Sequence, residues 1–275
     1  EHGGKSIEAF LEGYSYSVTA GDTQFQSYNA NHYCIQHLLY GGHFGEALEQ
    51  FSRFTTLLEQ AGNFDPIQYH KAFKQFAKYL TTGGQNVSTS LEGADFDVAT
   101  AERKLKESGS FTVLFPIYML QGVLELLSGN YAGAIERFTE MRKFESGALG
   151  MPFVPHSCMF EALAALDYAS LHSADRDPLI RRARKLLKRL KTWSKLGPEN
   201  YLHKALLVEG AIAEARDEIH RAFELYDHAI ERSLEGGFVF EAALASERAG
   251  KMYRRIGRER LSRIYASSAY DLFQR

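Results

Sequence analysis

The chain of 275 residues has only two cysteines, Cys34 and Cys158, too few for the disulfide framework of a small secreted protein. No apolar run reaches the roughly 18 residues that a membrane-spanning helix requires, and the first residues do not form a basic and then apolar leader. Hydrophobic residues make up 45% and charged residues 24% of the sequence, as in folded domains. We therefore expect a soluble, cytoplasmic protein whose thiols are reduced and packed.

The chain also lacks a strong excess of either charge, since its formal net charge is −2. Residues 1–100 carry 5 basic and 11 acidic side chains, residues 101–175 carry 6 and 9, and residues 176–275 carry 21 and 14. The basic balance of a nucleic-acid-binding domain is missing, so we expect no nucleic-acid partner. The positive C-terminal part either meets an acidic partner or spreads charge over a solvated surface, which is the simpler interpretation.

Motifs that indicate catalysis or metal binding are scarce. Gly3-Gly4-Lys5-Ser6 matches the end of a phosphate-binding loop, but the first glycine of that motif would fall before residue 1 and no strand precedes it. His32, Cys34 and His37 are close in sequence, yet on a helix His32 and Cys34 face different sides and cannot converge on one ion. No nucleophile-elbow or zinc-protease motif occurs. We expect no enzyme activity, no metal site and no cofactor.

Helical periodicity runs along most of the chain. In residues 198–216, for example, Tyr201, Ala205, Val208 and Ile212 form an apolar stripe that Leu202 and Leu206 widen. Turn signals such as Gly41-Gly42 and Gly197-Pro198 separate such segments. The pattern predicts helices near 5–19, 24–40, 44–60, 67–81, 95–108, 113–128, 131–145, 155–172, 178–194, 198–216, 218–235, 238–256 and 258–274.

A weak internal repeat groups these helices into hairpins. On the second helix of each hairpin an alanine is followed four residues later by a large residue and then, three later, by a small or apolar one. Small residues at Gly122, Gly210 and Gly250 fall where the helices of a hairpin could approach closely. The repeat is found at Ala47-Phe51-Phe54, Ala134-Phe138-Met141 and Ala222-Tyr226-Ala229, and more loosely at Ala183-Leu187-Leu190 and at Ala99 with Arg103.

The predicted fold is all-α, a right-handed superhelical solenoid of about six tetratricopeptide-like hairpins, with a mean period of about 44 residues against about 34 in the usual repeat. We expect a single domain over residues 1–275. Residues 1–20 would form a lone helix from a preceding repeat. Residues 82–94 would form an irregular loop, either an insertion with a role or a disordered segment.

Several segments carry a family resemblance: Phe160 to Leu163, Trp193 with residues 198–209, residues 222–230, and residues 238–257, with upstream likeness at Ala20-Gly21-Asp22 and from Tyr33 to Gly42. They are similar to the tetratricopeptide-like helical-repeat region of large multidomain signalling proteins. Those proteins combine a serine-threonine kinase-like domain, an AAA-type ATPase module and a hybrid histidine kinase. The resemblance implies an interaction and sensing segment without catalytic residues. Kinase and ATPase motifs do not occur in this chain.

Two groups of residues are candidates for partner binding. Asn200, His203, Lys204 and Glu209 lie on the first helix of a hairpin, the kind that lines the concave surface of a superhelix. Their alternative role is structural, with Glu209 or Glu247 pairing with Arg216 or Arg248. The second group is basic. Such a group can contact an anionic membrane, nucleic acid or an acidic protein, or it is the solvent-exposed face of an amphipathic helix, and the overall charge argues against nucleic acid. Its members are Arg181, Arg182, Lys185, Lys188, Arg189, Arg254, Arg255 and Arg258.

These observations favour a non-catalytic protein–protein interaction scaffold or regulatory segment, part of a larger signal-transduction protein. Its partner would be a protein or peptide, or neighbouring domains of the same polypeptide, and no membrane span is expected. The alternative is a small-molecule sensor that binds its ligand in the concave groove of the solenoid.

Overall fold

The computed structural model describes residues 2–82, 91–94 and 96–274, which form thirteen α-helices, three short 3-10 helices and no strand. Every α-helix begins and ends within three residues of its predicted bounds, which confirms the all-α class. Of the predicted loop at 82–94, residues 83–90 lie outside the described residues. The helices are η1 (Gly3–Lys5), α1 (Ser6–Ala20), α2 (Thr23–Tyr40), α3 (Phe44–Ala61), α4 (Phe64–Thr81), α5 (Val98–Ser108), α6 (Phe111–Leu127), α7 (Tyr131–Arg142), η2 (Glu145–Ala148), α8 (Phe153–Leu171), η3 (Ser173–Asp175), α9 (Arg176–Leu196), α10 (Pro198–Ala215), α11 (Ile219–Glu235), α12 (Val239–Arg255) and α13 (Glu259–Phe273).

The chain divides into two compact units, an N-terminal unit of Gly3–Val154 and a C-terminal unit of Pro155–Arg275 that also holds His2. The boundary falls at the start of α8. Consecutive helices pack against one another within each unit. A single continuous right-handed superhelix remains a prediction.

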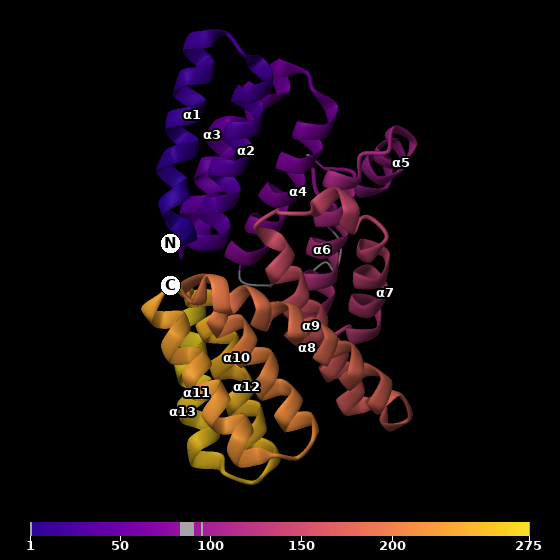
Figure 1. The fold of residues 1–275 in the computed structure, drawn as a ribbon, viewed down its shortest axis with the longest axis vertical. Helices are drawn as coiled ribbons and strands as arrows, with labels where there is room; N and C mark the ends of the chain where they lie inside the picture. The colour runs from indigo at the N-terminus through magenta and orange to yellow at the C-terminus, as the bar shows by residue number, and fades with distance from the viewer. Residues whose placement is uncertain (1, 83–90, 95, 275) are drawn as a thin grey trace. The chain divides into compact units, whose positions relative to one another are not determined.

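The most deeply buried helix of the N-terminal unit is α6, which lies beside α7 (Figure 1). Its residues from Val113 to Leu126 are all buried, as expected of a helix that is hydrophobic on every side. Helices α4, α5 and α7 pack against it, whereas α1 to α4 pack mainly on their neighbours in sequence. With residues 1–20 as a lone helix, the predicted order of hairpins pairs α5 with α4. In the structure the main partner of α5 is α6. Phe153 joins this core, with its ring centroid 6.0 Å from that of Phe73 and 5.9 Å from that of Phe115.

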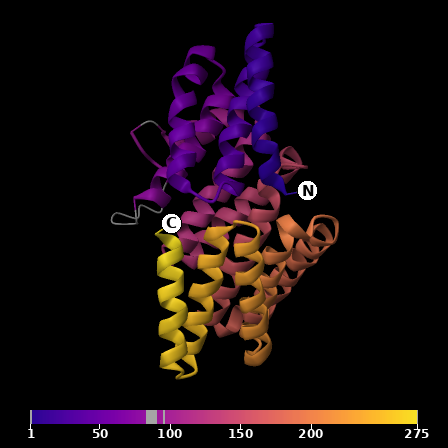
Figure 2. The ribbon, with the colours of Figure 1, turned by 90° about the vertical axis from the view of Figure 1, so that its left-hand side faces the viewer.

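In the C-terminal unit each helix from α9 to α13 packs against the next, and the last three run alongside one another in both views (Figures 1 and 2). Helix α10 also contacts α12. Helix α8 reaches α9 through a bond from Arg182 to Glu161 and reaches α12 through a bond from Arg248 to Asp167. The first helices of the three hairpins, α8, α10 and α12, therefore meet inside the unit.

The predicted repeat positions are buried in four of the five repeats, including Ala47, Phe138, Leu190 and Tyr226. The fifth was wrong, because Ala99 and Arg103 are exposed. In α5 the buried residues are Val98, Ala101 and Leu105, so the repeat is shifted by two positions. The side chain of Asp97 accepts a bond from the Thr100 amide and fixes the start of this helix, and contact with α6 then decides which face is buried.

Two predicted close approaches are confirmed. A Cβ atom added at Gly122 would lie 2.9 Å from the ring of Phe138, and one at Gly210 would lie 2.9 Å from the ring of Tyr226. Each glycine is on the first helix of a hairpin and each ring is at the large position of the repeat. The repeat therefore requires a residue without a side chain where the ring crosses the neighbouring helix.

Changing Gly210 to alanine is expected to lower the free energy of unfolding by about 1–3 kcal/mol, because the gain in helix propensity is smaller than the cost of overpacking against Tyr226. Gly45→Ala in α3 is the matched control, since nothing lies within 4 Å of its Cβ position. The control should stabilise the protein slightly. Urea unfolding of both variants checks the pair, and an unchanged midpoint for Gly210→Ala would show that the ring can move away.

Candidate functional site: the basic surface of α9 and its arginine pocket

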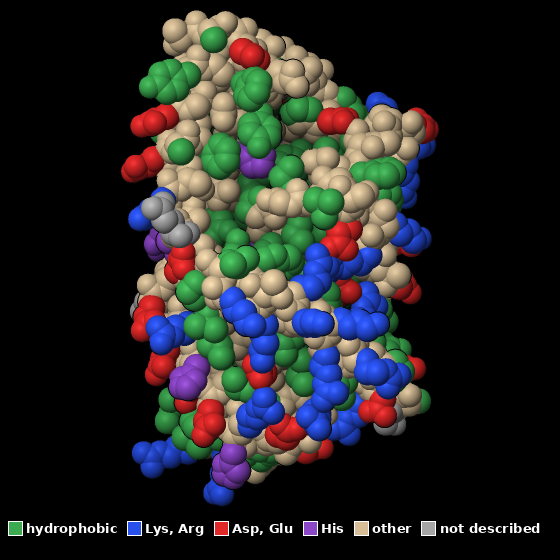
Figure 3. Space-filling model, in the orientation of Figure 1, with side chains coloured by type: hydrophobic (Ala, Val, Ile, Leu, Met, Phe, Trp, Pro, Cys, Tyr) green, Lys and Arg blue, Asp and Glu red, His purple; other side chains and the backbone are tan. Residues whose placement is uncertain are grey.

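Helix α9 carries most of the predicted basic residues on the side away from its apolar stripe. Ile180, Ala183, Leu186, Leu187 and Leu190 are buried, and the helical period turns the intervening residues outward. Figure 3 shows Lys and Arg side chains gathering over the C-terminal unit on the face in view. We call Arg181, Arg184, Lys185 and Lys188, which are all exposed, the basic face of α9.

Two other predicted basic residues of α9 have structural contacts. Nε of Arg182 donates to Oε1 of the buried Glu161 at 2.8 Å, which ties α9 to α8. The Arg189 guanidinium lies over Trp193, 5.3 Å from its ring centroid. Within the described part of the chain, no residue forms an ion pair with any member of the basic face. Its charge is therefore available to a partner.

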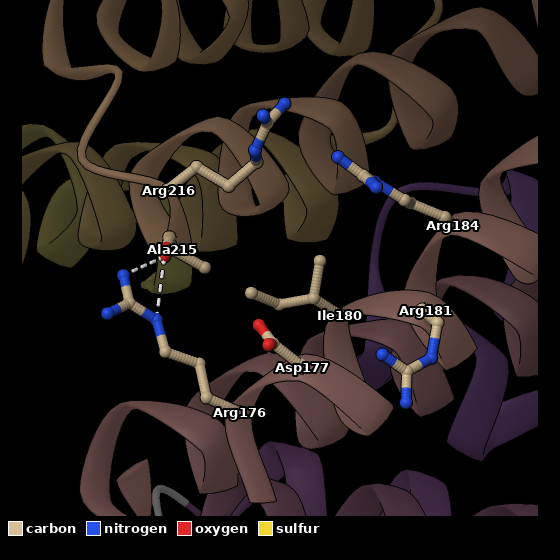
Figure 4. Close-up of a pocket in the computed structure, with 7 residues that line it drawn as sticks. All are labelled: Arg176, Asp177, Ile180, Arg181, Arg184, Ala215 and Arg216. Carbon is tan, nitrogen blue, oxygen red and sulfur yellow. Dashed lines mark hydrogen bonds between the residues drawn. The ribbon is translucent and has the colours of Figure 1, made fainter.

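A hollow of about 480 Å³ lies where α9 begins and α10 ends (Figure 4). Ile180, which is buried, and Ala215 supply its apolar lining. In the view of Figure 4, Arg184 and Arg216 extend toward each other from opposite sides, and Asp177 lies between Arg176 and Arg181. We call this hollow the arginine pocket; its lining residues are Arg176, Asp177, Ile180, Arg181, Arg184, Ala215 and Arg216.

Two of the four arginines in the pocket already have partners. Nε of Arg176 donates to the carbonyl oxygen of Ala215 at 3.1 Å, and its Nη2 lies 3.2 Å from Oδ2 of Asp217, so it satisfies the C-terminus of α10. Nη1 of Arg216 lies 2.9 Å from Oε1 of Glu218. Neither Arg181 nor Arg184 has such a partner within the described residues. The pocket thus holds two uncompensated guanidinium groups.

Asp217 links the pocket to the second predicted basic cluster. Besides Arg176, its carboxylate pairs with Arg255 of α12 at 3.7 Å, and Arg255 also lies 3.5 Å from Glu214. Arg254 and Arg258 of that cluster are exposed. Asp217 has a φ of 60°, and no other non-glycine residue in the described ranges has a positive φ. This left-handed residue ends α10, and it lets the Glu218 amide donate to the carbonyl oxygen of Ala213 at 3.0 Å.

The predicted concave-surface residues lie elsewhere than expected. Asn200, His203 and Lys204 are 7%, 1% and 0% exposed, so their side chains are in the interior. Glu209 is half-buried and pairs with Lys191 at 2.6 Å and Arg221 at 2.8 Å. The apolar stripe predicted for α10 was also wrong in one respect. Leu202 and Leu206, which were expected to widen the buried face, are only half-buried, whereas the polar residues His203 and Lys204 are buried.

The polar side of α10 is buried because α12 provides a charge partner. Nζ of Lys204 lies 2.8 Å from Oε1 of Glu241, donates to Nε2 of His203 at 2.7 Å, and lies 4.4 Å from the ring centroid of Phe238. Nε2 of His156, on α8, is 3.6 Å from the same Glu241 oxygen. Burial lowers the pKa of Lys204, and the negative charge of Glu241 opposes that shift.

A second ion pair, between half-buried side chains, joins α12 to α8. Nη1 and Nη2 of Arg248 donate to the two oxygens of Asp167 at 2.9 and 2.6 Å. The sequence suggests Glu209 or Glu247 as the partner of Arg248. Glu247 pairs with Lys251 instead. The polar seam, as we call it, joins α8, α10 and α12 where the sequence suggested an open concave surface. Its members are His156, Asp167, His203, Lys204, Glu241 and Arg248.

The N-terminal unit contains a separate buried polar group around His70. Its Nε2 donates to the carbonyl oxygen of Phe51 at 2.8 Å, and its Nδ1 is 3.1 Å from Oδ1 of Asn31. Burial lowers the pKa of His70 to about 4, and it does the same for His32. A hollow of about 280 Å³ lies between α3 and α4, and its lining includes Lys74 and Thr55, whose hydroxyl oxygen is 3.3 Å from Nε2 of His70.

The sequence did not indicate that Arg176, Arg216 and Asp217 belong to one site, the arginine pocket and its ion pairs. They come from the ends of two helices that meet only in the folded chain. The available signal was weak: a basic residue in the first turn of α9 and an Arg-Asp-Glu run where α10 ends. Helix ends are where such polar side chains are most often needed to satisfy free backbone groups.

Two further observations concern the described residues as a whole. They contain no group of histidine, cysteine or acidic side chains able to hold a metal ion. They also contain no helix with the length and apolar character needed to cross a bilayer. Comparison of the sequence with models of protein families and with curated proteins gave no match.

Proposed function

We propose that the chain is a non-catalytic helical-repeat segment that binds an acidic region of a protein partner through the basic face of α9. The proposal includes the finer assignments: tetratricopeptide-like hairpins in a right-handed superhelix, a place in a larger signal-transduction protein, and action in the cytoplasm. The observation that carries it is the group of four exposed cations on one helix without ion-pair partners in the described structure. Unpaired surface charges of one sign steer and select an oppositely charged partner.

The buried polar seam supports this choice of surface. In a superhelical repeat protein the first helices of the hairpins normally line the binding surface. Here α10 and α12 are joined by an ion pair between buried side chains, and α8 and α12 by an ion pair between half-buried side chains. A partner could reach Lys204 or Glu241 only by breaking those pairs. Binding to the basic face of α9 does not require these ion pairs to break.

The proposal predicts that Lys185→Glu with Lys188→Glu abolishes recovery of the protein partner by affinity capture from the cells that make this protein. The control carries the same charge change on α13, Arg260→Glu with Arg263→Glu, at two other exposed positions. Circular dichroism should show that both variants keep their helical content. Equal loss of partners with both variants, or with neither, would contradict a role for the basic face.

The second candidate function is a small-molecule sensor. The observation that favours it is the volume of the arginine pocket, about 480 Å³, which falls in the range of ligand sites. A thermal-shift screen against anionic metabolites separates this candidate from the first. A shift of the melting temperature that Lys185→Glu/Lys188→Glu leaves unchanged would favour the sensor.

A further inference from the structure

We infer that the arginine pocket is a binding site for a phosphate monoester dianion. The source of the phosphate, a phosphorylated side chain of the protein partner, rests on the proposed function. The chemistry of the pocket does not, because it follows from the residues that line it. The pocket lies beside the basic face of α9, so a partner bound there could place one modified side chain in the hollow.

The shape and lining of the pocket suit a phosphorylated side chain. Its apolar lining comes from Ile180 and Ala215, and its charged groups stand around them (Figure 4). The side chains of Arg176 and Arg216 are 44% and 47% exposed, so their guanidinium groups remain accessible from solvent. This combination suits a ligand with an apolar stem and an anionic head, as in a phosphorylated side chain.

The charge of the pocket favours an anion. Arg176 and Arg216 are engaged with Asp217 and Glu218, whereas Arg181 and Arg184 have no acidic partner within the described residues. The lining also contains the carboxylate of Asp177, so these three groups carry a net charge of +1. Both guanidinium groups attract a phosphate monoester and Asp177 opposes it, which is why removal of that carboxylate is expected to strengthen binding.

The kind of cation also favours phosphate. All four basic residues of the pocket are arginine, and no lysine lines it. The planar guanidinium group donates two parallel hydrogen bonds to a pair of phosphate oxygens, which lysine cannot do. Arg184 already points toward Arg216 across the hollow, whereas Arg181 points away from Arg184 and would have to turn to reach the same phosphate (Figure 4). Arg176 is held in place by Ala215 and Asp217, so part of the pocket is already rigid.

The experiment measures binding of a degenerate phosphoserine peptide library by fluorescence anisotropy, with the unphosphorylated library as reference, in about 0.15 M salt to screen diffuse attraction. We expect the phosphorylated library to bind at least about tenfold more tightly, because each charge-assisted bond contributes strongly. Arg181→Gln with Arg184→Gln should remove that preference. Asp177→Asn should strengthen binding severalfold, since it removes the carboxylate from the lining.

The matched control is Arg260→Gln with Arg263→Gln, which removes two exposed arginine charges of α13 outside the pocket and outside the basic face of α9. An equal loss of binding in this control would overturn the pocket, because it would show only general attraction to a positively charged surface. No preference for phosphate in the wild-type protein would overturn it too. Neither result bears on capture of the partner through Lys185 and Lys188, so failure of the pocket and failure of the proposed function can be told apart.

Competition with inorganic phosphate identifies the source. If the phosphopeptides bind more tightly than inorganic phosphate, the site recognises a phosphate on a protein partner. If inorganic phosphate binds equally well and Arg181→Gln/Arg184→Gln still abolishes both, the phosphate site is supported and its ligand is a free phosphate compound.

Discussion

Replacing Glu241 with leucine is expected to lower the free energy of unfolding of the C-terminal unit by about 3–5 kcal/mol, the usual cost of removing one partner from a buried ion pair. Lys204 is 0% exposed, and its Nζ would keep only the neutral His203 ring as an acceptor. Urea unfolding followed by fluorescence measures the effect, because the single tryptophan, Trp193, lies in α9 next to α10.

The double variant Lys204→Met with Glu241→Leu separates the charge from the packing. It removes both members of the pair and should recover most of the lost stability, since well-packed apolar residues can replace a buried ion pair at little cost. The surface pair Glu247 and Lys251 on the same helix is the control, and replacing it with the same residues should change stability little. Equal destabilisation in the double variant and the single variant would mean that the pair is not the coupled unit described above.

Mild acid is expected to destabilise the protein through its buried histidines. Burial lowers the pKa of His32 and of His70 from 6.5 to about 4, so both rings are neutral in the folded chain. Between those values the unfolded chain binds more protons than the folded chain, and stability therefore rises with pH across this window and falls as the pH is lowered. From about pH 7 to about pH 5 each fully buried histidine should cost about 2 kcal/mol.

The seam of the C-terminal unit should respond in the same direction. Burial and the neighbouring positive charge of Lys204 place the pKa of His203 well below its usual value. Protonation would put a second cation 2.7 Å from the Lys204 ammonium group, at the nitrogen that now accepts its hydrogen bond. Loss of helical structure and loss of native Trp193 fluorescence should therefore both move to lower urea concentrations in acid.

The variant His70→Gln tests the acid effect residue by residue. Glutamine can still donate to the Phe51 carbonyl oxygen but does not titrate, so the stability difference between the two pH values should shrink by about 2 kcal/mol. His220→Gln, at an exposed position in the other unit, should leave that difference unchanged. A His70→Gln variant with the pH dependence of the wild type would show that this ring is not the proton-binding group.

The helices could be predicted from the sequence because their signals are local. Apolar periodicity and the Gly, Pro and Asp residues at the breaks are read within one segment, and the thirteen predicted helices were all found. The close approaches at Gly122 and Gly210 were predicted for a similar reason, since the repeat places a large residue opposite each glycine.

The site could not be predicted in the same way. Lys204 looks like a surface residue until Glu241, 37 positions later, is placed beside it. Burying a lysine is unfavourable in isolation, so a sequence pattern assigns it to the surface. The basic residues of α9 were recognised, but their division into paired and unpaired groups depends on Glu161, Glu209 and Asp217. Those partners come from α8, from α10 and from the turn after α10.

The bond between Asp167 and Arg248 joins residues 81 positions apart, on the first and third hairpins of the C-terminal unit. In a linear repeat array each hairpin touches only its neighbours, so the array can lose hairpins one at a time from an end. Here the terminal hairpin of α12 and α13 is anchored beyond its neighbour, to α8. We therefore expect that the hairpin of α12 and α13 does not unfold separately, because its detachment would also break the ion pair to α8.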